Sequence, residues 1–178
     1  MGMDVSTIAR PEGRASLDRD FAALYQARFV DLTAQLYAFT GDALETQDLV
    51  QEAFIRAWKR WDRISRYDDP GAWVRRVAWN LAMTRHKRLK IFRRVPDHRV
   101  SPPPAPESGL DRLDLVVALR KLPHQIRRVV VLHYLADMSI ADIVAELDVA
   151  EGTVKSWLRR GRTELAIDLA GYRDGGRR

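Results

Sequence analysis

Residues 137–165, DMSIADIVAELDVAEGTVKSWLRRGRTEL, predict two short helices joined by a tight turn. Ser139 is a suitable N-cap for the first helix, because its side-chain oxygen can accept a hydrogen bond from a free backbone N–H of the first turn. The second helix is expected to begin near a cap at Thr153. Apolar residues recur at helical spacing through both segments; they are Ile140, Ile143, Val144, Leu147, Val154, Trp157, Leu158 and Leu165.

The connection between the two helices is predicted to be sharp. Asp148 stands in the turn, and Asp adopts the left-handed backbone conformation more readily than most residues. Ala141 is small, as we expect where one helix crosses close over another.

The second helix of this pair has a cationic outer face. Between Lys155 and Arg162 there are four cations and no acid. An amphipathic helix of this kind, presented by a partner helix at a steep angle, suits the major groove of DNA. An ordinary helical hairpin with a solvated basic face is the alternative.

The segment VAEGTVKSWLRRGRTEL closely resembles the helix-turn-helix of region four in bacterial RNA polymerase sigma factors of the sigma-70 family. This resemblance implies contacts to the promoter −35 element, made by Lys155, Ser156, Arg159 and Arg160, and we place Arg162 with them as a phosphate contact. Trp157 stands where an Arg is usual in the family. Its side chain could face inward or outward.

Composition limits the classes of protein that this chain can be. It has 178 residues, 46% of them hydrophobic, which is enough for one domain or two small ones. There is no cysteine, so disulfides and thiolate metal sites are excluded. No apolar run approaches the roughly 20 residues that span a bilayer, and the N-terminus lacks the apolar core of a secretory signal. We therefore expect a cytoplasmic protein without membrane insertion.

Charge is segregated along the chain. The net charge is +6, which suggests a polyanionic partner. Between Asp31 and Ile55 there are five acids and no Lys or Arg, whereas between Trp73 and Val95 there are eight Lys or Arg and no acid. This segregation predicts two partners of opposite charge.

The first domain is predicted over residues 16–91, with three main helices. One runs from Ser16 to about Thr40 and stops at Gly41, one spans about Ala43–Trp61, and one starts at Pro70 after an N-cap at Asp69. The second helix has an apolar stripe at helical spacing, which we expect to be core: Leu49, Ala53, Phe54, Ala57, Trp58 and Trp61.

The opposite face of the second helix is acidic and polar. A solvated face is the simple interpretation, but DLVQEAF resembles the region-two helix with which sigma factors dock on the clamp helices of the polymerase largest subunit. The resemblance implies Asp48, Gln51 and Glu52 as polymerase contacts, and Ile55 lies on the same side. Exposed carboxylates would repel DNA but suit a basic protein surface.

The third helix combines cations with aromatic residues. Arg76, Asn80, Met83 and Lys87 form one stripe, which Arg75 and Trp79 flank. Such a surface suits single-stranded nucleic acid, because unstacked bases can stack on the rings while the cations neutralise phosphates. Trp79 could instead belong to the core.

Resemblance to region two continues through PGAWVRRVAWNLAMTRHKR. It implies that this helix binds the promoter −10 element, and we assign the binding to Arg76, Trp79, Asn80, Met83 and Lys87. The loop at residues 63–67 would lie where family members hold a flipped-out base.

Residues 92–109 read as a linker, because five of the eight prolines lie between Val95 and Glu107. The region-three domain of larger sigma factors has no room there, which points to the compact extracytoplasmic-function (ECF) group. The second domain is then expected over residues 110–170, with one helix ending at Pro123, another over His124–Leu135, and a fraying tail after Ala170.

The sequence thus predicts an all-α fold of two small helical domains joined by a Pro-rich linker. The function implied is a sigma factor that binds core RNA polymerase, through the clamp helices and the flap, and directs promoter-specific initiation. The group also implies an anti-sigma partner. The alternative is a helix-turn-helix regulator that binds operator DNA without joining polymerase. We expect no enzyme, catalytic residue, cofactor or metal, since the four histidines are scattered without metal-ligand spacing.

Overall fold

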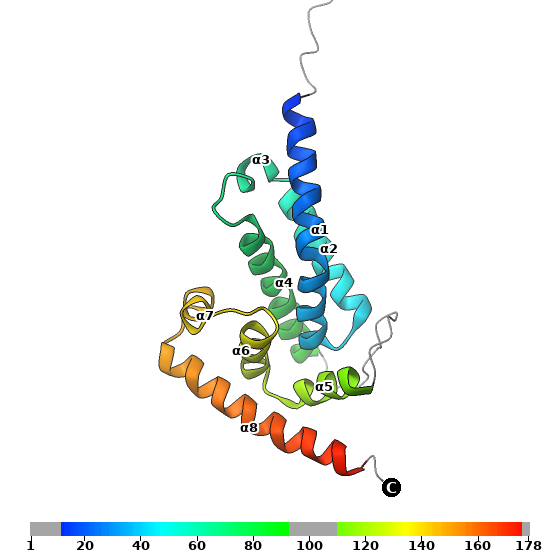
Figure 1. Ribbon diagram of the computed structural model, residues 1–178, viewed down its shortest axis with the longest axis vertical. Helices are drawn as coiled ribbons and strands as arrows, with labels where there is room; N and C mark the ends of the chain where they lie inside the picture. Colours follow the sequence, from blue (N-terminus) through cyan, green and yellow to red (C-terminus); the bar gives the residue numbers. More distant parts are fainter. Residues whose placement is uncertain (1–11, 93–109, 176–178) are drawn as a thin grey trace, which may run out of the picture.

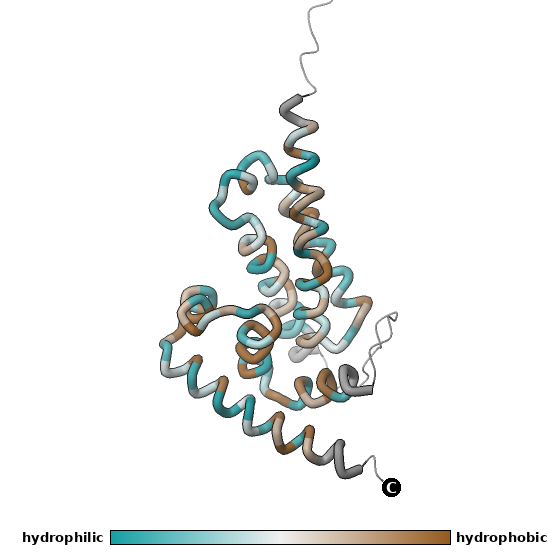
Figure 2. The backbone as a smooth tube through the Cα atoms, viewed as in Figure 1, coloured by the Kyte–Doolittle hydropathy of each residue, from teal (hydrophilic) through white to brown (hydrophobic). Residues whose placement is uncertain are grey.

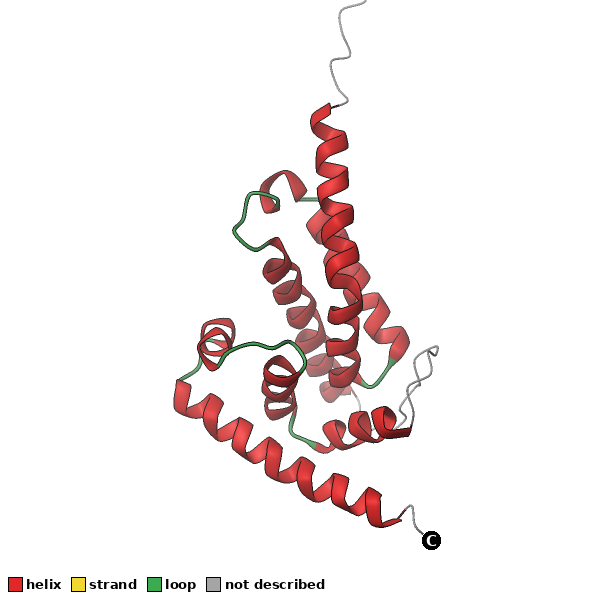
Figure 3. Ribbon diagram, in the orientation of Figure 1, coloured by secondary structure: helices red, strands yellow, loops and turns green. Residues whose placement is uncertain are grey.

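The structure, a computed structural model, describes residues 12–92 and 110–175, and these residues form eight α-helices and no strand (Figures 1 and 3). In chain order the helices are α1 (Glu12–Thr40), α2 (Ala43–Trp58), α3 (Trp61–Ile64), α4 (Pro70–Phe92), α5 (Leu110–Lys121), α6 (His124–Tyr134), α7 (Ile140–Leu147) and α8 (Glu151–Gly175). The all-α prediction is confirmed. The predicted linker lies almost wholly outside the described residues.

A tight corner joins α1 to α2. Gly41 adopts a positive φ of 69°, and its N–H donates to the carbonyl oxygen of Tyr37 at 2.8 Å. Asp42 then caps α2, because its Oδ1 accepts from the N–H of Glu45 at 2.9 Å. Glycine takes this left-handed conformation without the cost that a Cβ imposes. The predicted end of the first helix at Gly41 is therefore confirmed.

The end of α2 differs from the prediction. The helix stops at Trp58, and a separate short helix, α3, begins at Trp61, the residue at which we expected the second helix to end. Trp61 is buried, and its indole N–H donates to the carbonyl oxygen of Leu17 at 2.8 Å. Trp58, expected in the core, is 43% exposed, because it lies on the same face of α2 as the exposed Ile55 three residues earlier.

Among the last four helices, α6 packs against α8. A Cβ at Gly161 would lie 2.5 Å from Cγ2 of Val130, so glycine allows the close approach of these helices. Ala141, for which we predicted this role, is exposed. The helix α6 ends at Tyr134, one residue before the predicted end at Leu135, and Leu135 is 39% exposed. The structure also continues α8 to Gly175, beyond the predicted fraying point.

Buried side chains of α1, α2 and α4 form one core cluster with those of α5, α6, α7 and α8. A smaller cluster joins Tyr37 and Ala43 to Val116 of α5. Polar and apolar residues alternate along the helices (Figure 2), and in the described part of the chain no helix has the length and apolar character needed to cross a membrane.

Candidate nucleic-acid interface

The helix pair α7–α8 is fixed by a complete set of local hydrogen bonds. The Oγ of Ser139 accepts from the N–H of Asp142 at 3.1 Å, and the carboxylate of Asp142 accepts from the N–H and hydroxyl of Ser139 at 3.1 and 2.6 Å. These bonds to Ser139 lower the pKa of the Asp142 carboxyl group, because they favour its ionised form. At the other end of α7, Asp148 is left-handed, with φ of 52° and ψ of 54°. Both predictions for this motif, the cap and the turn, are confirmed.

The helix α8 presents its cations to solvent. It begins at Glu151, two residues before the predicted cap. Val154 and Leu158 are buried, while all five candidate −35 residues are exposed on the outer side; they are Lys155, Ser156, Arg159, Arg160 and Arg162. Trp157 is partly buried and packs against the core, so this side chain faces inward.

Two of the α8 cations already have partners along the helix. Lys155 pairs with Glu151, and Nε of Arg160 lies 2.6 Å from a carboxylate oxygen of Glu164. Such exposed pairs are worth only about 0.3–0.5 kcal/mol, so a phosphate or a base edge can replace the carboxylate at little cost. No ion pair within the described residues involves Arg159 or Arg162.

The face of α2 that we assigned to polymerase is exposed to solvent, as predicted. Asp48, Gln51 and Ile55 are exposed, and Glu52 is partly exposed and bonded to Arg56 at 2.7 Å. Two apolar residues extend this face: Leu44, which is 72% exposed, and Trp58, which we expected in the core and which is 43% exposed. We call the exposed row the α2 stripe: Leu44, Asp48, Gln51, Ile55 and Trp58. Their helical spacing could have revealed it in the sequence.

Only some of the candidate −10 residues on α4 share its exposed surface. Arg76, Asn80 and Lys87 are exposed, and Met83 is partly buried. Trp79 has no exposed surface, because Phe39 packs on its ring at a centroid distance of 5.1 Å and Arg128 of α6 covers it at 5.5 Å. In this arrangement Trp79 belongs to the core and cannot stack on a base.

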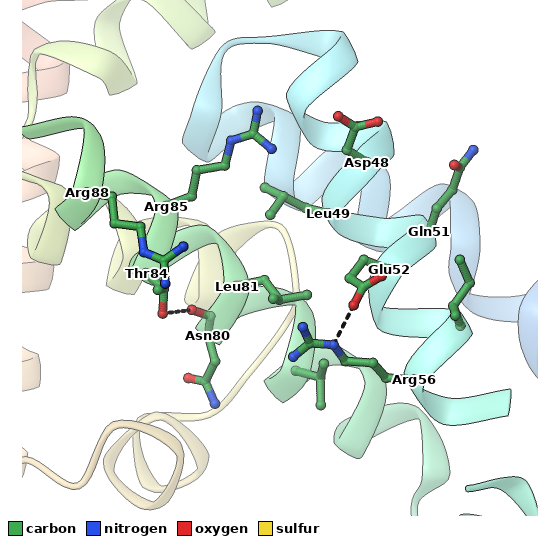
Figure 4. Close-up of a pocket in the computed structure, with 12 residues that line it drawn as sticks. Asp48, Leu49, Gln51, Glu52, Arg56, Asn80, Leu81, Thr84, Arg85 and Arg88 are labelled. Atoms are coloured by element: carbon green, nitrogen blue, oxygen red, sulfur yellow. Dashed lines mark hydrogen bonds and ion pairs between the residues drawn. The ribbon is translucent and has the colours of Figure 1, made fainter. Parts of the chain in front are cut away.

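A groove of about 910 Å³ lies between α2 and α4 (Figure 4). Its α2 wall holds acidic and polar residues that we assigned to polymerase, and its α4 wall holds Asn80, Arg85 and Arg88. The Nε of Arg85 lies 3.2 Å from a carboxylate oxygen of Glu45, which ties the two walls together. The two candidate interfaces of the first four helices are therefore adjacent.

Comparison with known families agrees with both halves of this geometry. The family description Sigma-70 region 2 matches residues 24–91, and Sigma-70, region 4 matches residues 112–165. The first match covers α2 and α4, and the second covers the helix-turn-helix. A four-helix unit joined to a helix-turn-helix unit defines this chain as a sigma factor of the sigma-70 class.

Curated relatives narrow the class further. "ECF RNA polymerase sigma factor SigL" of Mycobacterium tuberculosis (strain ATCC 25618 / H37Rv) is 34% identical over an alignment of 174 positions that covers 91% of this chain and 96% of the relative. "ECF RNA polymerase sigma factor SigW" of Bacillus subtilis (strain 168) is 29% identical and covers 84% and 87%. The chain belongs to the ECF RNA polymerase sigma factors, proteins that direct transcription from promoters.

Solved structures share the fold. The sigma factor RpoE in complex with the anti-sigma factor NepR from Bartonella quintana is 26% identical, with a TM-score of 0.73 over 85% of this chain and 98% of that one. CnrH in complex with the cytosolic domain of CnrY is 25% identical, with a TM-score of 0.62 over 86% of this chain and 90% of that one.

Proposed function

We propose that this sigma factor works through three faces. The α2 stripe, together with Glu52, docks on the core polymerase, the exposed cationic side of α4 binds the −10 element, and the outer face of α8 binds the −35 element. In this proposal residues 16–91 and 110–170 act as two domains. They are connected by residues 92–109.

The observation that carries the proposal is the arrangement of α7 and α8. A capped helix, a left-handed turn at Asp148 and a second helix with five exposed polar side chains form the unit that enters the major groove in helix-turn-helix proteins. Arg guanidinium groups on that face suit guanine edges and phosphates, which they bind with two parallel hydrogen bonds.

The α2 stripe supports a protein partner rather than DNA. It combines carboxylate and amide groups with exposed Leu44, Ile55 and Trp58, which water solvates poorly. Apolar anchors surrounded by charge are typical of a protein interface, and the acidic charge selects a basic partner. An operator-binding regulator would have no use for this stripe, so the second hypothesis is not favoured.

Two further partnerships follow from the relatives. Both solved relatives are described in complex with a second protein, which is the anti-sigma factor NepR in one case and the cytosolic domain of CnrY in the other. We infer an anti-sigma partner for this chain as well. We also infer a non-enzymatic protein that acts in the cytoplasm, where polymerase and its template are located.

Reconstitution with core polymerase tests the proposal. The chain is mixed with core enzyme and passed over a gel-filtration column, and the resulting complex is incubated with fragmented genomic DNA. We expect co-elution and retention of a restricted set of fragments. Retention of the same fragments by the chain without polymerase, and no co-elution, would instead support the operator-binding regulator.

A further inference from the structure

The ring of Trp157 on α8 is anchored in the protein on one side and reaches solvent on the other. Trp157 is partly buried and packs against the core cluster. Within the described residues its indole N–H makes no hydrogen bond, yet the Nε1 atom is not enclosed by the protein. Trp61 differs, because its N–H donates to the carbonyl oxygen of Leu17 at 2.8 Å. The N–H of Trp157 is therefore a fixed donor at the surface of α8.

The indole N–H limits what Trp157 can bind, because it donates a hydrogen bond and accepts none. Tryptophan is common at interfaces where one end of the ring is apolar and the other is wet, since it contributes both packing and a polar group. Water satisfies such a group in the free protein, and an acceptor oxygen of a ligand can replace that water at little cost. The ring therefore suits a ligand that offers an acceptor at the edge of α8.

Two rows of side chains flank the exposed face of α8. The cationic row has residues at i, i+4 and i+7: Lys155, Arg159 and Arg162. The Trp157 row has residues at i, i+3 and i+7: Trp157, Arg160 and Glu164. Each residue advances about 100° around a helix, so the two rows lie on opposite flanks. Arg160 is paired with Glu164 at 2.6 Å, and the Trp157 row therefore carries no net charge.

A helix that lies in the major groove of DNA meets both walls of the groove. With its side chains a helix is about 10–12 Å wide, and the groove is about 12 Å wide. The walls are the sugar–phosphate backbones, so each row of α8 faces one line of phosphates. The cationic row meets its line with charged donors. The Trp157 row meets the other line with the indole N–H, since we assign Arg160 to a base edge.

We propose that Trp157 is a neutral phosphate anchor of the helix-turn-helix. Its indole N–H donates to a phosphate oxygen on the wall of the −35 groove opposite the cationic row. Uncharged donors make many of the phosphate contacts of DNA-binding proteins, and these contacts fix register and orientation without reading sequence. The core already holds the ring, so the contact orders little that was free. This inference rests on the −35 role proposed for α8, and it adds that one wall of the groove is bound without charge.

Salt dependence separates a neutral anchor from a cationic one. The holoenzyme is titrated with a promoter fragment that it retains, over a series of salt concentrations. Trp157→Phe keeps an aromatic ring and removes the N–H. We expect binding about 2- to 10-fold weaker at every salt concentration, with the slope of log affinity against log salt unchanged. Arg162→Ala is the matched control, and it should reduce that slope by about 0.9, because it removes a cation from a phosphate.

Two further substitutions separate the N–H from the packing of the ring. Benzothienylalanine at position 157 has the outline of tryptophan with sulfur in place of the N–H, and it should weaken binding as Trp157→Phe does. Trp157→Arg places a cation against the same phosphate and should steepen the slope by about 0.9. Urea denaturation should show a folded chain with each substitution.

Three results would overturn the proposal. The first is unchanged affinity of the chain with benzothienylalanine, and the second is a slope that Trp157→Arg does not steepen. The third is a loss that differs among fragments with single base changes in the −35 element, which would place the ring on a base edge. If Arg159→Ala and Arg162→Ala weaken binding while the changes at position 157 do not, this inference fails alone. Unchanged binding by all of them would contradict the −35 role itself.

Discussion

Gly161 of α8 lies so close to Val130 of α6 that a Cβ at this glycine would be 2.5 Å from the Cγ2 of the valine and 3.1 Å from a methyl carbon of Ile126. Both neighbours are buried and branched, so neither can move aside easily. This contact sets the distance between α8 and the rest of its unit. It therefore also sets the angle at which α8 presents Arg159 and Arg160, the side chains that we propose as DNA contacts.

Gly161→Ala tests this packing. We expect a loss of about 1–2 kcal/mol in the free energy of unfolding, because overpacking outweighs the gain in helix propensity. Gly152→Ala is the control, since nothing lies within 4 Å of a Cβ there. It should be neutral or slightly stabilising. Urea denaturation measures both, and equal stabilities of the two variants would contradict the packing argument.

Asp48→Arg with Glu52→Arg tests the polymerase face. Both side chains lie on the outer side of α2, so the fold should lose no more than about 0.5 kcal/mol per site. Binding to core polymerase should be abolished because the acidic charge is reversed. The measurement is co-elution with core enzyme, with Asp18→Arg and Asp20→Arg, exposed on α1, as the matched double reversal. Unchanged co-elution of the α2 variant would remove this assignment.

Arg76→Ala and Asn80→Ala test the −10 face. Both residues are exposed on α4, and we expect promoter melting to be impaired more than recruitment to polymerase. Permanganate reactivity of unpaired thymines in the assembled complex reports melting, and Arg19→Ala on α1 serves as an exposed control. Normal melting by both variants at limiting concentration would show that neither side chain binds the −10 element.

Substitutions on α8 distinguish base contacts from phosphate contacts. Arg159→Ala or Arg160→Ala should cost about 1–3 kcal/mol and relax the preference at one base position, whereas Arg162→Ala should weaken binding to all sequences alike. The measurement is holoenzyme binding to −35 duplexes that carry each single base change. If neither Arg159→Ala nor Arg160→Ala changes the preference anywhere, direct readout by this pair is wrong.

The local sequence predicts features that depend on neighbouring residues. The Ser139 cap, the left-handed Asp148 and the corner at Gly41 follow from side-chain and backbone preferences within a few residues. The exposed cations of α8 follow from helical spacing in the same way. The exposed face of α8 was therefore predictable, apart from the side that Trp157 takes.

Features that depend on distant segments were not predictable. Trp79 has a sequence position between two stripes, and its burial is decided by Phe39 and Arg128, which lie far away in the chain. The sequence around Gly161 does not show that this residue packs against α6, because that contact depends on where α6 lies in the fold. Trp58 and Trp61 are both aromatic at core spacing, and only the end of α2 decides that Trp61 takes the core position.

Transcription start mapping tests the central claim, which is that this chain gives polymerase its promoter specificity through faces on both units. Core polymerase transcribes a fragmented genomic template with and without the chain, and the 5′ ends of the transcripts are sequenced. The account predicts new start sites that share one −10 and one −35 sequence and that disappear with the doubly reversed α2 variant. Identical start sites with and without the chain, at concentrations where it co-elutes with core enzyme, would contradict it.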